Sequence, residues 1–402
     1  MMKLNDLILG YSNSYEDFLK DKNIPNISDI CKISFLIMTY NEERCIKRCV
    51  NSIESLANEI IIIDTGSTDE TLKIISELGN AKVKLFHEKW VDDFSYMRNQ
   101  LIKKAKNDWV FMIDADEYIE PVSLEKISML INLVDNVDIV PKVISPKLTN
   151  TDGSSLYITQ RIFKKNPHLK YIGYAHEELR YNNNPIFPYI CIDIPFHHDG
   201  YENEIVETKN KNDRNLKLLK KMLKSEPNNL RWVFFCAREM LSLNYSRQHI
   251  QEMVLKGMRN SNDEYPILKS GLYSILMETS MDSDENYNGY KKNALECNPN
   301  NIDIYYLDAL RTFNKLIIDG NNYISKNQNV VLSLEETDSF IHSEGDHLFY
   351  LWGKFHFSLQ NYKQAFLWWN KIGAYNMRND VIRELKDIKE DISKFIESYK
   401  NP

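Results

Sequence analysis

The sequence predicts an α/β domain followed by an all-α domain, and three features of it support this prediction. From residue 32 onward, short apolar runs alternate with helical patterns, and the clearest runs are "KISFLIM", "EIIIID" and "WVFMID". Such near-continuous runs are typical of parallel strands that are buried on both faces. From Thr208 onward the pattern is almost entirely helical. The 402 residues exceed one ordinary core, so two or three domains are expected.

The expected elements follow from the change in hydrophobic period along the chain. We expect a short helical segment at residues 1–30, an α/β domain at 31–205 and a helical domain at 206–402. Helices are expected at 43–56, from a capping box at Ser67 and Glu70 to Leu78, and at 94–106. After Pro121, the pattern predicts two longer strands whose direction stays open, "VDIVPKVISP" and "LYITQRIFKK".

The helical part contains a degenerate repeat. Three stretches align on a small residue, namely Ala237, Ala309 and Gly353. In the last stretch, Gly353 is followed by Ala365 and Trp369, a spacing typical of a tetratricopeptide helix pair. A plain helical bundle without repeats is the alternative interpretation.

Composition and charge exclude several classes of protein. The net charge of −7 argues against broad binding of nucleic-acid backbones, which requires a basic face. No apolar run approaches the length of a membrane span, and no secretory signal is visible. The 6 cysteines form no C-x-x-C pair and no zinc-like spacing. We therefore expect a cytoplasmic protein with reduced thiols.

Polar residues follow the expected strands where each strand ends. Because the carboxyl ends of parallel strands meet at one edge of a sheet, these residues are expected to form a single site. An arginine at the start of the 94–106 helix is expected beside them. The candidate residues of this site are Thr39, Tyr40, Asn41, Glu42, Asp64, Arg98, Asp114, Ala115 and Asp116.

The acids in this set indicate how a phosphorylated ligand is held. The chain has no G-x-G-x-x-G after the first strand and no phosphate-cradling P-loop. The remaining way to hold a diphosphate with carboxylates is through Mg²⁺ or Mn²⁺. On this interpretation Asp116 binds the metal, Asp114 binds a ribose or the metal, and Ala115 leaves space for the ligand. Asp-x-Asp alone is a weak motif, and its alternative is a solvated strand end.

Together, "SFLIMTYNEE", "EIIIIDTGSTDET" and "DFSYMRNQLIKKAKNDWVFMIDADE" resemble the family 2 glycosyltransferases, which have the GT-A fold. The resemblance covers residues 32 to about 200. It implies that the segment from Thr39 to Glu42, with Asp64, holds the base and ribose of a nucleotide sugar. It also implies that Arg98 seats the nucleotide and that Asp114 and Asp116 bind the sugar nucleotide and the metal.

Further motifs resemble the peptide glycosyltransferases of glycocin bacteriocin biosynthesis, namely "KWVDDFSYMRN", "YAHEE", "FHHDGY" and "EPNNLRWVFFCARE". This resemblance implies an inverting transfer of a hexose, expected to be glucose from UDP-glucose, to a Cys or Ser/Thr side chain of a precursor peptide. It favours Glu177 as the base, with Glu178 as the alternative. It assigns His198 to the metal, although a histidine bonded within a loop fits almost as well. Arg161 either meets the diphosphate or pairs with an acid.

The sequence leaves two alternative functions open, and it also leaves a homodimer possible. The acceptor is alternatively a cell-wall or lipid-linked saccharide. A scaffold protein with an inactive front domain is the second alternative, although the retained acids weigh against it. The helical tail fits both a peptide-binding groove and a homodimer interface.

Overall fold

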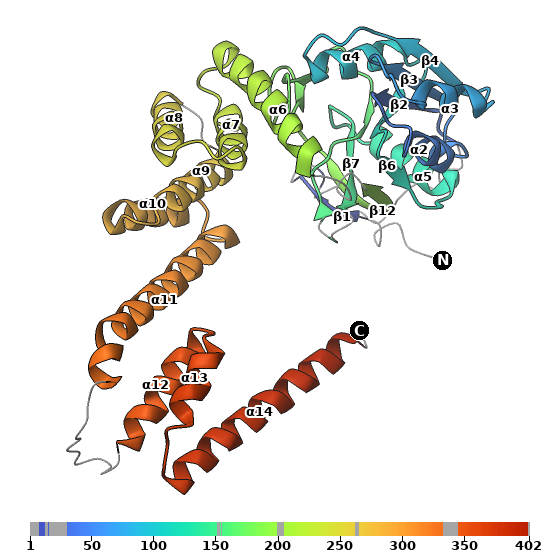
Figure 1. Cartoon of the computed structure of the whole chain (residues 1–402). Helices are drawn as coiled ribbons and strands as arrows, with labels where there is room; N and C mark the ends of the chain where they lie inside the picture. The colour runs from blue at the N-terminus through green and yellow to red at the C-terminus, as the bar shows by residue number, and fades with distance from the viewer. Residues whose placement is uncertain are drawn as a thin grey trace. The chain divides into compact units, whose positions relative to one another are not determined.

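A computed structural model describes residues 8–12, 15, 30–150, 153, 155–198, 205–261, 265–332 and 345–400. The chain divides into two compact units, Met1–Thr279 and Ser280–Pro402. The first unit contains the main sheet and the helices up to α9 (Figure 1). The second unit contains only helices in its described part. This arrangement confirms the predicted α/β domain followed by a helical region.

Four parallel strands form one half of the main sheet, in the order β5, β2, β3, β4. They are β2 (Ile33–Thr39), β3 (Glu59–Asp64), β4 (Val83–His87) and β5 (Trp109–Asp114). Their alternating side chains reach two separate cores. Phe35 and Ile37 belong to one apolar cluster, whereas Leu36 belongs to the other. Burial on both faces explains why β2, β3 and β5 are apolar at nearly every position, whereas the edge strand β4 is less buried.

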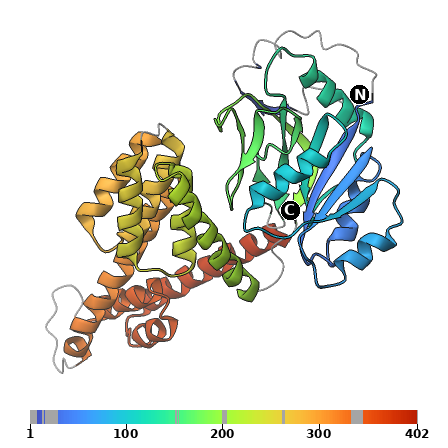
Figure 2. The same cartoon turned by 90° about the horizontal axis from the view of Figure 1, so that it is seen from above.

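Helices cover both faces of these strands, as Figure 2 shows from above. The first cluster includes residues of α2 (Ile46–Ile53), α3 (Thr71–Glu77) and α5 (Leu124–Asp135). The second includes Met97 and Leu101 of α4 (Phe94–Lys104). The central strands are therefore enclosed, and only their ends are open to a ligand.

The other half of the sheet is mixed. Strand β9 pairs antiparallel with β5 and with β7, and β7 is parallel to β12. Strands β1, β6 and β8 complete the sheet at its edges, and β10 with β11 forms a separate two-stranded sheet. These elements are β1 (Ile8–Tyr11), β6 (Glu117–Ile119), β7 (Val143–Asn150), β8 (Ser155–Leu156), β9 (Ile162–Lys164), β10 (Leu169–Ile172), β11 (Glu178–Tyr181) and β12 (Ile190–His198).

Two local predictions are wrong. Residues 8–11 form strand β1, paired with β12, and not a helix; most of the other residues before position 30 lie outside the described ranges. Ser67 does not cap a helix, because α3 begins only at Thr71. The Ser67 hydroxyl instead accepts a hydrogen bond from the backbone N–H of Asn41 (2.9 Å) and so joins two loops.

The helical region begins within the first unit. Its first four helices are α6 (Ile205–Ser225), α7 (Leu230–Ser242), α8 (Arg247–Asn260) and α9 (Pro266–Thr279). The second unit contains α10 (Asp284–Cys297), α11 (Ile302–Leu332), α12 (Asp346–Ser358), α13 (Tyr362–Trp369) and α14 (Tyr375–Lys400). Within the described ranges, no helix combines the length and the hydropathy that a bilayer span requires.

The helix pair predicted from the repeat is present as α12 and α13. Ala365 is fully buried, and a Cβ at Gly353 would overlap the Trp369 indole. That indole is fixed, since its N–H donates to the carbonyl of Tyr350 (3.1 Å). The small residues thus allow the two helices to approach closely. The middle stretch, with Ala309, lies instead in the single 31-residue helix α11.

Candidate active site

Three parallel strands end side by side at the predicted site. In the sheet register, Thr39 of β2 lies opposite Asp64 of β3, and Met38 lies opposite Asp114 of β5. The strand ends therefore bring residues from three distant segments of the chain to one edge, as the sequence predicts.

The Asp64 carboxylate is buried and organises the loop that follows it. It accepts hydrogen bonds from the backbone N–H groups of Gly66 (3.0 Å) and Ser67 (3.2 Å). Asn41, in a left-handed conformation with φ 54°, accepts a bond from the N–H of Thr68 (2.7 Å). The loops after β2 and β3 are thus joined to each other. Tyr40 is exposed at 55%, at the rim of this edge.

Asp114 lies between the guanidinium groups of Arg98, which is buried, and Arg161, which is largely buried. Its carboxylate is 2.9 Å from Arg98 and 2.7 Å from Arg161. Burial opposes ionisation of this carboxyl, but the two arginines outweigh burial and lower its pKa well below the usual range. Arg161 also pairs with Glu117 (3.0 Å), so of the two roles left open for it, pairing with an acid is the one observed.

Glu117 is a site residue that the sequence analysis missed. Its side chain is 1% exposed, and it accepts a hydrogen bond from the backbone N–H of Asp114 (2.7 Å). Burial, followed by the nearby Asp114 charge, raises its pKa to about 7, although Arg161 opposes this shift. The signal available in the sequence was a third acid directly after Asp116.

Asp116 lies on the other side of the buried Ala115 and contacts a histidine. The antiparallel pairing of β6 with β12 brings His198 to this position, where its Nε2 is 3.2 Å from Oδ2 of Asp116. This hydrogen bond raises the pKa of His198. Glu42 faces the same acids, and burial followed by the Asp116 charge raises its pKa to about 7.

The two candidate bases point to different partners. Glu177 pairs with Arg98, with 2.5 Å between Oε1 and Nε, and so joins the cluster around Asp114. Glu178 pairs with Arg180 (2.9 Å) and with Arg231 of α7 (3.2 Å). The fold therefore brings Glu177, and not Glu178, to the carboxyl edge of the strands.

The comparisons with known proteins agree with this arrangement. Residues 34–187 match the family model described as Glycosyl transferase family 2. The chain carries a family 2 glycosyltransferase domain. This match spans the parallel strands, the Asp-x-Asp and Glu177.

One curated relative extends the likeness of this glycosyltransferase beyond that domain. The chain is 28% identical to the SPbeta prophage-derived glycosyltransferase SunS of Bacillus subtilis, over 97% of this chain and 98% of that protein. It is 30% identical to a TPR repeat-containing protein of Synechococcus elongatus, over 37% of this chain and 35% of that protein. Among solved structures, S. aureus TarS 1-349 in complex with UDP-GlcNAc matches with 17% identity and a TM-score of 0.36. That match covers 72% of this chain and 92% of TarS 1-349.

The candidate site could bind a divalent cation through only a few protein side chains. In the described ranges, no group of three or more His, Cys, Asp or Glu side chains has the arrangement of a metal cage. Asp116 and His198 are adjacent, and Asp116 is not paired with an arginine among the ion pairs that the structure shows. Mg²⁺ is commonly held by one or two carboxylates together with substrate phosphates and water. The donor set therefore suits a cation whose remaining ligands come from a diphosphate.

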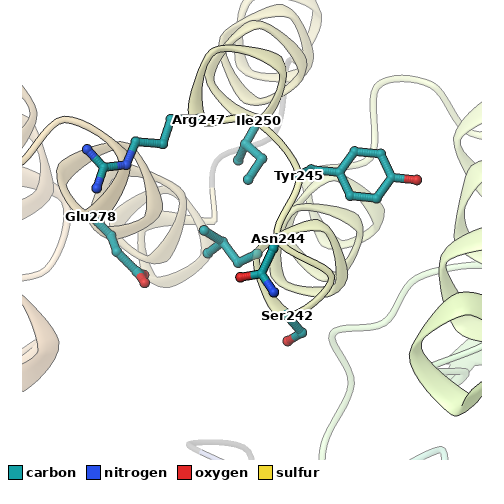
Figure 3. Close-up of a pocket in the computed structure, with 7 residues that line it drawn as sticks. Ser242, Asn244, Tyr245, Arg247, Ile250 and Glu278 are labelled. Atoms are coloured by element: carbon teal, nitrogen blue, oxygen red, sulfur yellow. The ribbon is translucent and has the colours of Figure 1, made fainter. Parts of the chain in front are cut away.

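An open pocket lies apart from this site, in the helical part of the glycosyltransferase, between the α7–α8 turn and the end of α9. Figure 3 shows Arg247 and Glu278 facing one another, with Tyr245 on the other side. None of the residues predicted for the site lines this pocket. We therefore assign no catalytic role to this pocket.

Proposed function

We propose that this glycosyltransferase is a metal-dependent, inverting enzyme that transfers a hexose, glucose above all, from a UDP-sugar to a Cys or Ser/Thr side chain of a bacteriocin precursor peptide. One observation carries the chemistry: Asp114, Asp116, His198 and Glu177 converge at the carboxyl edge of the strands. The identity to SunS over almost the whole of both chains supports the likeness to peptide-modifying enzymes.

The match to the glycosyltransferase family model supports the roles proposed for the nucleotide-binding residues. The Thr39–Glu42 segment and Asp64 lie at the carboxyl ends of β2 and β3, where a base and ribose would bind. Arg98 and Asp114 pair with each other at the end of β5, where the diphosphate would bind. Asp116 and His198 would hold Mg²⁺ or Mn²⁺, which neutralises the charge of the departing diphosphate when it is bound.

Glu177 is assigned as the base that removes the acceptor proton. A carboxylate in this position acts as a general base when it lies within hydrogen-bond reach of the acceptor. A thiol acceptor, with a pKa of about 8.5, already contains some thiolate near neutrality and requires little assistance. A hydroxyl acceptor requires far more. Glu177→Gln is therefore expected to slow transfer to serine more than transfer to cysteine.

Mass spectrometry of reaction products tests the proposed function. The chain is incubated with Mn²⁺, UDP-sugars and Cys- or Ser-containing precursor peptides, in parallel with Asp116→Ala. A gain of one hexose on the peptide, lost in the variant, supports the proposal. Transfer only to lipid-linked or cell-wall saccharides favours the alternative acceptor. Absence of transfer to any acceptor, with no UDP release, favours the inactive scaffold, and full activity of Asp116→Ala contradicts the metal role.

A further inference from the structure

The loop between β10 and β11 carries Glu177 and is held on one side by α4. The N–H of Phe94 donates to the carbonyl of Tyr174 (3.1 Å), and the N–H of Ser95 donates to the carbonyl of Gly173 (3.3 Å). Arg98, one turn further along α4, holds the Glu177 carboxylate itself. The nucleotide side of the loop is thus fixed by the glycosyltransferase domain.

The other side of this loop is held by α7, at the beginning of the helical region. The imidazole of His176 stacks on the ring of Phe235, with 4.2 Å between centroids and 8° between planes. Its Nε2 is 3.1 Å from Oε1 of Glu239, and the guanidinium of Arg231 donates to the His176 carbonyl (3.0 Å). Three side chains of one helix therefore act on a single loop residue.

The backbone of His176 shows why these contacts matter. Its φ of 52° is in the left-handed region, which is uncommon for a residue other than glycine and costs about 1–3 kcal/mol unless its surroundings compensate. His176 directly precedes Glu177, so this conformation sets the direction in which the Glu177 side chain leaves the loop. A histidine that relaxed to an ordinary conformation would turn Glu177 away from Arg98.

Gly173, at the start of the same loop, lies against α7. It has a φ of 123°, and a Cβ there would be 2.7 Å from the Trp232 ring of α7. Trp232 is fully buried, and its indole N–H donates to Glu226 (2.8 Å), so its ring has little freedom to move. The glycine thus allows the loop to lie directly on the helix.

We propose that α7 is a positioning element for Glu177: Phe235, Glu239 and Arg231 hold His176 in its left-handed conformation and so fix the direction of the Glu177 carboxylate. This inference rests on the proposed function, in which Glu177 is the base. In this proposal the three α7 side chains act through His176 and not directly on the reacting atoms. Their effect is preorganisation, because a displacement of about 1 Å in a catalytic group costs up to a hundredfold in rate.

Steady-state kinetics of donor turnover test this role. UDP release is measured with Mn²⁺ and UDP-glucose, UDP-galactose or UDP-GlcNAc, with water as the acceptor, so no peptide is required. Phe235→Ala and Glu239→Ala are expected to lower kcat by about tenfold to a hundredfold, with the KM for the donor nearly unchanged. Phe235→Tyr and Glu239→Gln, which retain the ring and the acceptor oxygen, are expected to remain within about threefold of the original kcat. Arg238→Ala, on the exposed face of the same helix, is the matched control and is expected to leave kcat unchanged.

A double-mutant cycle with Glu177→Gln separates this inference from the proposed function. Phe235→Ala is expected to cause no further loss of kcat when Glu177 is already replaced. If Glu177→Gln slows turnover and Phe235→Ala does not, or if the two losses multiply, the positioning role is wrong. If the unmodified enzyme turns over the donor and Glu177→Gln has no effect, or if no UDP is released with either water or the Cys- and Ser-containing peptides as acceptor, the proposed function itself fails and the inference with it.

Hydrogen exchange checks the same proposal without activity. Phe235→Ala is expected to increase amide exchange in the segment 173–178 while exchange in β2, β3 and β5 stays unchanged. The more conservative Phe235→Leu serves in its place if the alanine variant fails to fold. Unchanged exchange in 173–178 would contradict the proposal.

Discussion

At the scale of single residues, the site is a network of buried and partly buried charges that compensate one another. Arg98 and Arg161 lie among Asp114, Glu117 and Glu177, and each guanidinium contacts two carboxylates. Buried ion pairs contribute little net stability, but removal of one partner leaves an uncompensated charge. The network therefore makes the arginines structurally important before any ligand binds.

Arg161→Ala is expected to lower the free energy of unfolding by about 3–5 kcal/mol, because Asp114 and Glu117 lose a shared partner inside the protein. Urea denaturation measures this change. Lys164→Ala, three residues further along the chain in β9, is the control, since its ion pair with Asp135 is much more exposed and is worth about 1 kcal/mol or less. Equal losses in the two variants would contradict the account of the network.

The ionisation of Glu226 is expected to make the stability of the fold depend on pH. Burial opposes its ionisation, but hydrogen bonds from Arg180, Trp232 and Asn229 outweigh burial and lower its pKa to about 2. Because the folded-state pKa lies below the unfolded value of about 4.5, this group stabilises the fold above that value. The stabilisation is lost as the pH falls from about 4.5 to about 2.

Glu226→Gln is therefore expected to lower the Tm at pH 7, and the difference from the unmodified chain should shrink at pH 3. Thermal denaturation at the two pH values measures this. A difference that stays constant between them would show that the carboxylate charge of Glu226 does not stabilise the fold.

The residues that sequence reasoning found are those that follow apolar strands. Asp64, Asp114 and Asp116 could be placed at one edge because strand ends are visible in the hydrophobic pattern. Glu117 was not found, because its contact with Arg161 depends on the pairing of β9 with β5. Strand order is not visible in local periodicity. The choice between Glu177 and Glu178 likewise depends on α7, far along the chain.

At the scale of elements, the parallel strands and their helices were predicted well because their pattern is long and regular. The N-terminal strand β1 was predicted as a helix, since a four-residue edge strand has too few residues to show a period. The prediction of a capping box at Ser67 was wrong, because the Ser67 hydroxyl instead accepts a hydrogen bond from the backbone of Asn41 in another loop. The α12–α13 pair was predictable because its small residues follow a known spacing.

Gly353 tests the packing of that helix pair. Gly353→Ala places a methyl group against the Trp369 indole and is expected to destabilise the second unit by about 1–3 kcal/mol. Gly289→Ala is the matched control within α10. It has nothing within 4 Å of the new Cβ and is expected to stabilise the helix by about 0.5–1 kcal/mol. Calorimetric unfolding of both variants measures the effects, and the same sign in both would contradict the packing argument.

At the scale of the whole molecule, the chain forms two compact units, and the candidate site lies entirely in the first, Met1–Thr279. We expect a chain that ends at Thr279 to fold and to release UDP from the donor at a rate within about tenfold of the full chain, since α7 is retained. Transfer to a peptide is expected to be lost if the later helices bind it. UDP-release and mass-spectrometric assays on the two chains measure this, and unimpaired peptide transfer would exclude a role for α10–α14.

The central claim is that the acids at the ends of β2, β3 and β5 hold a nucleotide diphosphate through a divalent cation. Isothermal titration of UDP into the unmodified chain, with Mn²⁺ and then with EDTA, tests it most directly. The account predicts that UDP binds at least about tenfold more tightly with Mn²⁺, and that Asp116→Ala removes this difference. Equal affinity of the unmodified chain for UDP under the two conditions would contradict it.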